Sequence, residues 1–166
     1  MVDIMLENCK RPIIFPLSNP TSKAEADPRW VLEYTDGAAI VASGSPFPPV
    51  TVGGREFHIG QGNNAFIFPG VGLGAIASGA KEIRPSLFTA AAHALAGTVS
   101  AERMEAGSVY PPIEELFDVS LKVAVAVYKE AVESGLGVGF ADGHENIEEK
   151  IGDLMWLPAY SRYIAK

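Results

Sequence analysis

The sequence has few of the residues on which several kinds of chemistry depend. It contains one cysteine, Cys9, so no disulfide can form within the chain, as is typical of a reducing compartment. Its three histidines, His58, His93 and His144, lie far apart, and none has a cysteine or histidine nearby at metal-ligand spacing. We therefore expect neither a disulfide-stabilised fold nor a metal site on this chain.

Positive charge and long apolar runs are also scarce. The 13 Lys and Arg residues are outnumbered by 20 Asp and Glu residues, which gives a formal net charge of −7. Nucleic-acid binding needs clustered basic residues, and a membrane helix needs about 20 consecutive apolar residues. The first residues lack a basic leader followed by an apolar core. We expect a cytoplasmic protein that binds neither nucleic acid nor a membrane.

The rest of the composition is that of an ordinary globular protein. With 166 residues, of which 48% are hydrophobic, the chain is long enough for one domain that buries about 70% of its unfolded surface. No internal repeat is evident. Residues 1–8 have the apolar spacing of a helix but no N-cap, so we expect the chain to begin in the middle of a fold.

Short apolar runs bounded by turn residues predict buried parallel strands, and longer periodic segments predict helices. Asp27 and Pro28 form a typical helix start, and the glycines and prolines of residues 47–59 predict an irregular excursion with a small hairpin that ends near Phe57. The small residues after Pro69 predict a helix packed closely on the sheet. The predicted strands are residues 12–17, 38–42 and 65–68, and the other predicted helices are residues 86–96, 112–134 and 145–157.

Two segments join an apolar run to uncharged carboxamide side chains. The first contains LSNPT at residues 17–21, and the second contains GQGNN at residues 60–64. An asparagine offers one acceptor and two donors without charge, so it suits a carboxylate, a hydroxyl or a carboxamide, but it is neither an acid nor a base. Pro20 favours extended geometry at Asn19, which we therefore expect at the carboxyl end of a strand, where open α/β sheets bind ligands.

Each of these polar residues also has a purely structural interpretation. Asn19 suits an Asx turn before a helix, and the pair Asn63 and Asn64 suits a turn. Ser43 and Ser45, in SGSPF at residues 43–47, suit a serine-proline turn as well as a cofactor contact. The spacing of these residues does not decide between the two interpretations.

A glycine pattern at residues 70–75 fits the loose dinucleotide-binding motif GxGxxA. The acidic residue expected about 20 positions later is absent, because the chain there reads ALAG at residues 94–97. We therefore interpret these glycines as sites of close helix packing.

In its LSNPT, SGSPF and GQGNN motifs, the chain resembles the carboxyl-terminal, NAD-binding portion of the large-type malic enzymes. In that family LSNPT is followed by SGSPF, by GQGNN and by an aromatic segment that ends in proline-glycine. The same words occur here in the same order, at residues 17–21, 43–47 and 60–70, and residues 110–112 and 155–160 resemble the family's ending. Where the family commonly continues with glutamate-cysteine-threonine after LSNPT, this chain has EADP at residues 25–28.

The resemblance implies a fold and a set of roles. It implies an α/β fold, a partial Rossmann-like parallel sheet flanked by helices with a helical C-terminal tail. Residues 1–135 would form the second half of the NAD(P)-binding domain, and residues 136–166 a linker and the tail. It assigns Asn19, Asn63 and Asn64 to malate and also gives Asn19 a nicotinamide contact. Ser43 and Ser45 are expected near the cofactor.

The resemblance also implies that this chain holds part of an active site. The lysine base, the tyrosine acid and the carboxylates that bind Mg²⁺ or Mn²⁺ precede the matching portion in malic enzymes, so no catalytic residue is expected here. The partners implied are malate, NAD or NADP, the missing N-terminal portion and further copies in a homo-oligomer. A malolactic enzyme segment and a stand-alone, non-catalytic binding module remain alternatives. We expect no malate-dependent NAD(P)H formation by the chain alone.

Overall fold

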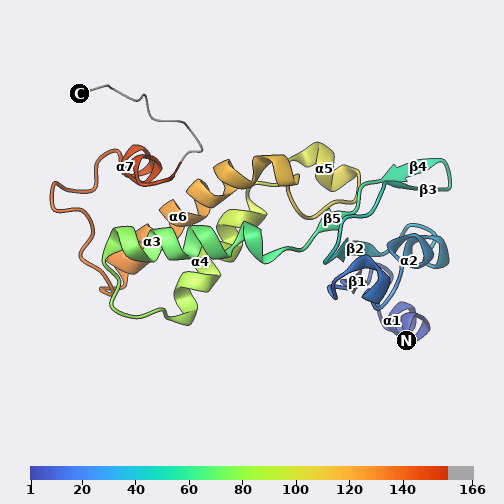
Figure 1. The fold of residues 1–166 in the computed structure, drawn as a ribbon. Coiled ribbons are helices and arrows are strands. Elements are labelled where there is room, and N and C mark those ends of the chain that lie inside the picture. The colour runs from blue at the N-terminus through green and yellow to red at the C-terminus, as the bar shows by residue number, and fades with distance from the viewer. Residues whose placement is uncertain (157–166) are drawn as a thin grey trace, which may run out of the picture.

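The computed structural model describes residues 1–156 and has two parts at opposite ends of an elongated molecule (Figure 1). One part holds a three-stranded parallel sheet, a β-hairpin and the first two helices. The other is built of helices, and one of its short helices lies on the side that faces the first part (Figure 1). This α/β arrangement confirms the predicted Rossmann-like fold class. The end of the helix predicted at residues 145–157 and the tail beyond it lie outside the described residues.

The sheet consists of β1 (Ile13–Ile14), β2 (Ile40–Ser43) and β5 (Gly60–Gln61), in the order β1-β2-β5 with both pairs parallel. The strand predicted at residues 38–42 is confirmed. The one predicted at residues 12–17 is shorter than expected, because Pro12 and Pro16 have no N–H to donate to a neighbouring strand. Their carbonyls still accept hydrogen bonds from Ile40 and Gly44, so the chain follows β2 as far as residue 16.

Two helices and a hairpin complete this part. They are α1 (Val2–Asn8), α2 (Pro28–Tyr34), β3 (Val50–Val52) and β4 (Arg55–Phe57), with the 3₁₀ turn η1 (Thr21–Lys23), which begins at the last residue of LSNPT. Asp27 caps α2 as predicted, since its carboxylate accepts the N–H of Arg29 at 2.8 Å. The hairpin predicted to end near Phe57 is confirmed. Its turn uses Gly53 and Gly54 at positive φ, as a tight hairpin requires.

The helical part contains three longer helices and two short ones. They are α3 (Phe68–Ser78), α4 (Pro85–Ala96), α5 (Ala101–Glu105), α6 (Leu116–Glu133) and α7 (Ile147–Asp153), with the 3₁₀ turns η2 (Asn64–Phe66) and η3 (Ile113–Glu115). The helices predicted at residues 86–96, 112–134 and 145–157 are confirmed with shifted ends. Helix α5 was not predicted.

The strand predicted at residues 65–68 is wrong. Asn63 caps η2 by accepting the N–H of Ala65 at 2.9 Å, and α3 begins at Phe68 with Pro69 in its first turn. A short apolar run does not distinguish a strand from a buried helical turn by its period, whereas proline in a first helical turn favours the helix.

Gly70 and Gly74 of α3 lie against α6, so the prediction that this helix packs on the sheet is also wrong. A Cβ on Gly70 would lie 2.6 Å from Val123, and one on Gly74 would lie 2.5 Å from the carbonyl oxygen of Ala124. The dinucleotide-like pattern is therefore inside a helix and serves close helix packing.

The two parts have separate cores. Val31, Leu32, Val41 and Phe57 belong to the buried cluster beside the sheet. The helical part is centred on a cluster that includes Phe66, Leu87, Val119, Val123 and Val127. Tyr110 connects the two parts, since its ring centroid lies 6.3 Å from those of both Phe15 and Phe66.

Candidate functional site

The polar residues singled out in the sequence follow the carboxyl ends of three adjacent parallel strands. Asn19 comes after β1, Ser43 is the last residue of β2 and Asn63 comes after β5. Because the strands are parallel and neighbours, their carboxyl ends share one edge of the sheet, which is where open α/β sheets bind ligands.

Asn19 and Ser45 are in direct contact at this edge. The Ser45 hydroxyl donates a hydrogen bond to Asn19 Oδ1, although the two residues are 26 positions apart. Ser45 is 4% exposed, whereas Asn19 is exposed, and the Asn19–Pro20 peptide bond is cis. The contact uses the carbonyl of the Asn19 carboxamide, and within residues 1–156 no acceptor is present for its NH₂ group.

Ser43 makes its hydrogen bonds with backbone groups of neighbouring segments. It is fully buried, and its hydroxyl donates to the carbonyl of Pro16 at 3.3 Å. Its own carbonyl accepts the N–H of Gly62 at 2.8 Å. Ser43 therefore ties the segment after β1 to β2 and β2 to the GQGNN segment, and its cofactor contact stays a prediction.

Gln61 and Gly44 contribute to the edge more than the sequence indicated. Gln61 Nε2 donates to the Gly44 carbonyl at 3.2 Å. A Cβ on Gly44 would lie 2.0 Å from the carbonyl oxygen of Leu17, so only glycine lets the LSNPT and SGSPF segments approach this closely. The glycine of SGSPF and the two glycines of GQGNN were the available signal in the sequence.

The two neighbouring asparagines have different surroundings. Asn63 is half-buried, and its side-chain oxygen caps η2 through Ala65, which is the turn interpretation given above. Its NH₂ group has no acceptor among the described residues. Asn64 is exposed, and the described residues make no hydrogen bond to its side chain. The structure thus brings Asn19 and Ser45 into contact, and neither is hydrogen-bonded to Asn64 among the described residues.

A carboxylate organises the loop that carries Asn19. The backbone N–H and the hydroxyl of Ser18 donate to the Glu25 carboxylate at 3.1 and 2.6 Å. The Ser18 hydroxyl, followed by the backbone donors, stabilises the ionised form and lowers the pKa of Glu25 below its ordinary value of 4.5. Glu25 thereby closes the loop of residues 18–25 on itself.

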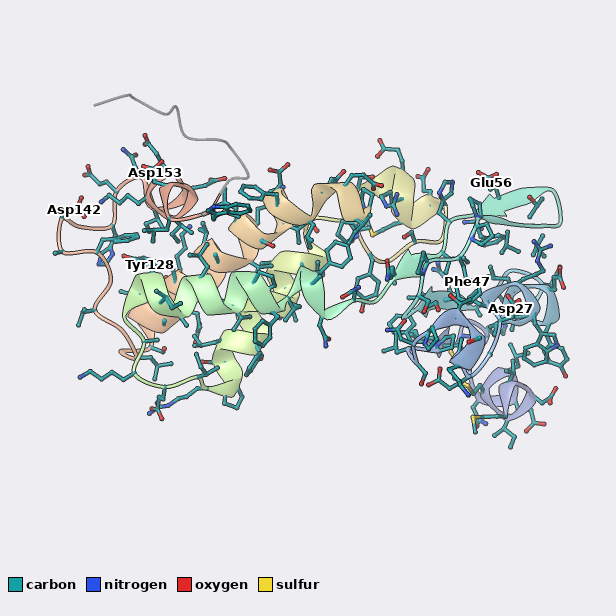
Figure 2. The ribbon with its side chains drawn as sticks, in the orientation of Figure 1. Asp27, Phe47, Glu56, Tyr128, Asp142 and Asp153 are labelled. Carbon is teal, nitrogen blue, oxygen red and sulfur yellow. The ribbon has the colours of Figure 1, made fainter. Side chains whose placement is uncertain are left out.

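A cavity of about 340 Å³ adjoins the edge on the side of Gln61. Phe47, labelled in Figure 2, and His58 lie in its wall, and His58 Nε2 lies 3.1 Å from a carboxylate oxygen of Glu56. Arg103 also lines the cavity, and its guanidinium donates to the Tyr110 carbonyl and the Ser108 hydroxyl at 3.2 and 3.3 Å.

The chemistry of the edge is uncharged hydrogen bonding. Within residues 1–156, no three His, Cys, Asp or Glu side chains come close enough together to hold a metal ion. No described helix is both long and apolar enough to cross a membrane. The donors and acceptors at the edge suit a carboxylate or a carboxamide.

Residues 1–132 match the family model described as the malic enzyme NAD-binding domain. The chain belongs to this malic enzyme family. It is 45% identical over 163 residues to the NAD-dependent malic enzyme of Shewanella sp. strain ANA-3, which covers 98% of this chain and 29% of that protein. The NAD-dependent malic enzyme of Aliivibrio salmonicida strain LFI1238 is 43% identical over the same shares. This malic enzyme chain therefore spans about 29% of the length of these relatives.

Solved malic enzyme structures share the fold. The malic enzyme from Pyrococcus horikoshii Ot3 superposes with a TM-score of 0.63 at 32% identity, over 86% of this chain and 29% of that one. The Entamoeba histolytica malic enzyme gives a TM-score of 0.62 at 24% identity, over 84% and 25%, which is a similarity of fold alone. The predicted malic enzyme family is confirmed, whereas the roles of individual asparagines and serines stay predictions.

Proposed function

We propose that this chain is the part of an NAD-dependent malic enzyme that holds malate and the nicotinamide end of the cofactor. The whole enzyme would oxidise and decarboxylate malate to pyruvate and CO₂. The observation that carries the proposal is the contact between Ser45 and Asn19 at the shared carboxyl edge of β1, β2 and β5. The family match and the relatives' names support the choice of reaction and of NAD.

The Ser45 contact orients the Asn19 carboxamide. With Oδ1 accepting from Ser45, the NH₂ group is the part left to donate, and a donor suits a malate carboxylate or the carboxamide oxygen of nicotinamide. We assign the same type of role to Asn63, whose oxygen is used in the η2 cap, and to the exposed Asn64. Ser43 and Ser45 would border the cofactor.

Bound NAD would accept a hydride from the malate hydroxyl carbon, and the asparagines would fix the substrate against it without carrying protons. The proton-transferring residues and metal-binding carboxylates implied by the family resemblance lie outside this chain. We therefore propose that the chain alone does not turn over malate. We also propose that residues 1–135 are the second half of the NAD-binding domain, that residues 136–166 are a linker and tail, and that the whole enzyme is a homo-oligomer.

A chimera tests this proposal. The 163 residues of the Shewanella sp. strain ANA-3 enzyme that align with this chain are replaced by the chain itself. Asn19→Ala is then compared with the unsubstituted chimera in malate-dependent NADH formation with Mn²⁺. Loss of an oriented donor predicts a fall of about 10- to 100-fold in kcat/KM for malate.

The control is Asn8→Ala on α1, where the carboxamide donates to the Ile4 carbonyl at 2.7 Å, away from the sheet edge. It should leave kcat/KM unchanged within about twofold, because surface substitutions of this kind shift stability by only about 0.5 kcal/mol. Equal kinetics for Asn19→Ala and Asn8→Ala would contradict the role of Asn19. Lactate in place of pyruvate would assign the chain to malolactic chemistry instead.

A further inference from the structure

We propose that the opposite end of the sheet holds a second binding site, for an organic anion with at least two negative charges. The site is a cavity of about 730 Å³ at the amino ends of β1 and β2, whereas the proposed malate site is at their carboxyl ends. Lys10 and Arg11 come just before β1, Ala39 comes just before β2, and Ile40 is the first residue of β2. We call this cavity the basic pocket.

Three cations gather at the basic pocket in a chain whose net charge is −7. Lys10, Arg11 and Arg55 line it, and Glu105 is the one acidic residue among its described lining residues. None of the three cations takes part in a salt bridge with another residue of 1–156. Like charges held near one another repel, and an anion bound between them would relieve that repulsion.

Arg55 is held in place for such a ligand. Its guanidinium carbon lies 4.6 Å from the centroid of the Phe57 ring, and one Nη donates to the backbone carbonyl of Glu105. A guanidinium has five N–H donors, so most remain available. An arginine that is already oriented loses less conformational entropy when it binds a carboxylate or phosphate in a two-point contact.

Two glycines, Gly37 and Gly107, lie against the Phe57 ring on which Arg55 packs. A Cβ on Gly37 would lie 2.7 Å from the Phe57 ring, and one on Gly107 would lie 2.8 Å from it. Both glycines also have positive φ, +72° and +84°, which other residues rarely adopt. A larger residue at either position would therefore collide with the Phe57 ring. The ring in turn packs against the Arg55 guanidinium.

Size and lining define the class of ligand. Pockets for small molecules usually have volumes of about 300–1,000 Å³, so the basic pocket exceeds what a single inorganic ion needs. Its apolar lining, which includes Ile40, Phe57 and Met104, suits the organic body of the ligand, while the cations suit its charges. Organic phosphates and polycarboxylates share this chemistry, and the experiment separates them.

Isothermal titration calorimetry of the full 166-residue chain with ADP, pyrophosphate and citrate tests the proposal. We expect a measurable Kd for ADP or citrate that weakens as salt is raised, since exposed cations are screened. ADP alone would assign the pocket to organic phosphates, and citrate alone to polycarboxylates. Pyrophosphate should bind more weakly than the organic anion because it makes no apolar contacts.

Two variants and a matched control locate the binding. Arg55→Gln and the double variant Lys10→Gln/Arg11→Gln should each weaken the Kd at least about tenfold, because each removes charge-assisted hydrogen bonds. Lys81→Gln removes one exposed charge outside the pocket and should change the Kd less than twofold. Circular dichroism and thermal unfolding of each variant establish that the fold is kept.

The proposal is overturned if neither ADP nor citrate binds, or if folded Arg55→Gln and Lys10→Gln/Arg11→Gln bind as tightly as the unsubstituted chain. This experiment does not involve malate turnover, and its residues lie at the other end of the strands. Failure here therefore leaves the proposed function standing, and failure of the chimera leaves the basic pocket standing.

Discussion

At the scale of single residues, the candidate site depends on whether the oxygen or the NH₂ group of each asparagine side chain is already hydrogen-bonded within the protein. Asn19 and Asn63 both use their side-chain oxygen within the protein, the first with Ser45 and the second with the N–H of Ala65. Both therefore retain donors, which is the polarity that a carboxylate or a carbonyl oxygen needs. Structural and ligand-binding roles are combined in one side chain instead of excluding each other.

Asn63 allows the two roles to be separated. Asn63→Ser keeps an oxygen that can cap η2 but removes the NH₂ group, whereas Asn63→Ala removes both. In the chimera we expect both variants to lose about tenfold or more in kcat/KM for malate. Only Asn63→Ala should also lower the free energy of unfolding, by about 1 kcal/mol, as measured by urea denaturation. Full activity of Asn63→Ser would show that Asn63 is only a cap.

The loop that carries Asn19 should respond to pH through Glu25. Hydrogen bonds from Ser18 lower the pKa of Glu25 in the folded state, so this contribution to stability is present above pH 4.5 and is lost as the pH falls below it. In Ser18→Ala, NMR titration should find the Glu25 pKa closer to its ordinary value. The stability difference between Ser18→Ala and the unsubstituted chain should shrink in acid, and a constant difference would contradict this assignment.

The direct contacts at the site were beyond what the sequence determines. The sequence predicted Asn19 at the carboxyl end of a strand, and the structure has it after β1. The sequence did not predict β5, so it did not indicate that Asn63 follows a neighbouring strand of the same sheet. The bond between Ser45 and Asn19 joins residues 26 positions apart, and it depends on the close approach of Gly44 to Leu17. Local sequence preferences do not predict a contact between residues so far apart in the chain.

At the scale of secondary-structure elements, the helical part is held together by the contact of α3 with α6. Gly70 and Gly74 bring the two helices together, and the sequence correctly indicated close packing there. It did not reveal the partner, because small residues mark a close approach without indicating what approaches. The strand predicted at residues 65–68 failed for a related reason, since four apolar residues fit a strand and a helical start equally well.

The α3 glycines provide a matched pair of variants. Gly74→Ala places a methyl group 2.5 Å from the Ala124 carbonyl oxygen and should lower the free energy of unfolding by about 1–3 kcal/mol. Gly72→Ala has no atom within 4 Å of the new Cβ and should raise it by about 0.5–1 kcal/mol through better helix propensity. Urea denaturation measures both, and shifts of the same sign would refute the packing described here.

The docking of the segment before α7 depends on Tyr128. This side chain is 1% exposed, its hydroxyl accepts the Phe140 N–H at 2.8 Å, and it lies 3.1 Å from His144 Nδ1 (Figure 2 labels Tyr128). Tyr128→Phe leaves that N–H without its partner and should cost about 1–3 kcal/mol of stability. Tyr34→Phe, which removes an exposed hydrogen bond to Asp3, should cost less than about 0.5 kcal/mol. Equal costs would mean that the Tyr128 hydroxyl is dispensable.

At the scale of the whole molecule, the chain matches part of a longer relative and its sheet has an exposed edge. It spans about 29% of the Shewanella relative, and its sheet has β1 at one edge with Ile13 60% exposed. An exposed apolar edge strand favours pairing with another strand. We therefore expect association with the remainder of a malic enzyme to complete both the sheet and the active site.

Complementation by co-expression checks that expectation. The chain alone should form no NADH from malate, and neither should the Shewanella enzyme lacking its aligned 163 residues. Together, the two pieces should co-purify and restore activity. Ile13→Lys on the free edge should abolish co-purification, whereas Ile76→Lys, on an exposed position of α3, should not. Co-purification that survives Ile13→Lys would exclude β1 as the joining edge.

The rate of NADH and pyruvate formation from malate, NAD and Mn²⁺, compared between the unsubstituted chimera and the chain alone, tests the proposed function. The proposed function predicts NADH and pyruvate in equal amounts from the chimera, within about tenfold of the parent enzyme's kcat, and none from the chain alone. A folded chimera without turnover, or turnover by the chain alone, would contradict it.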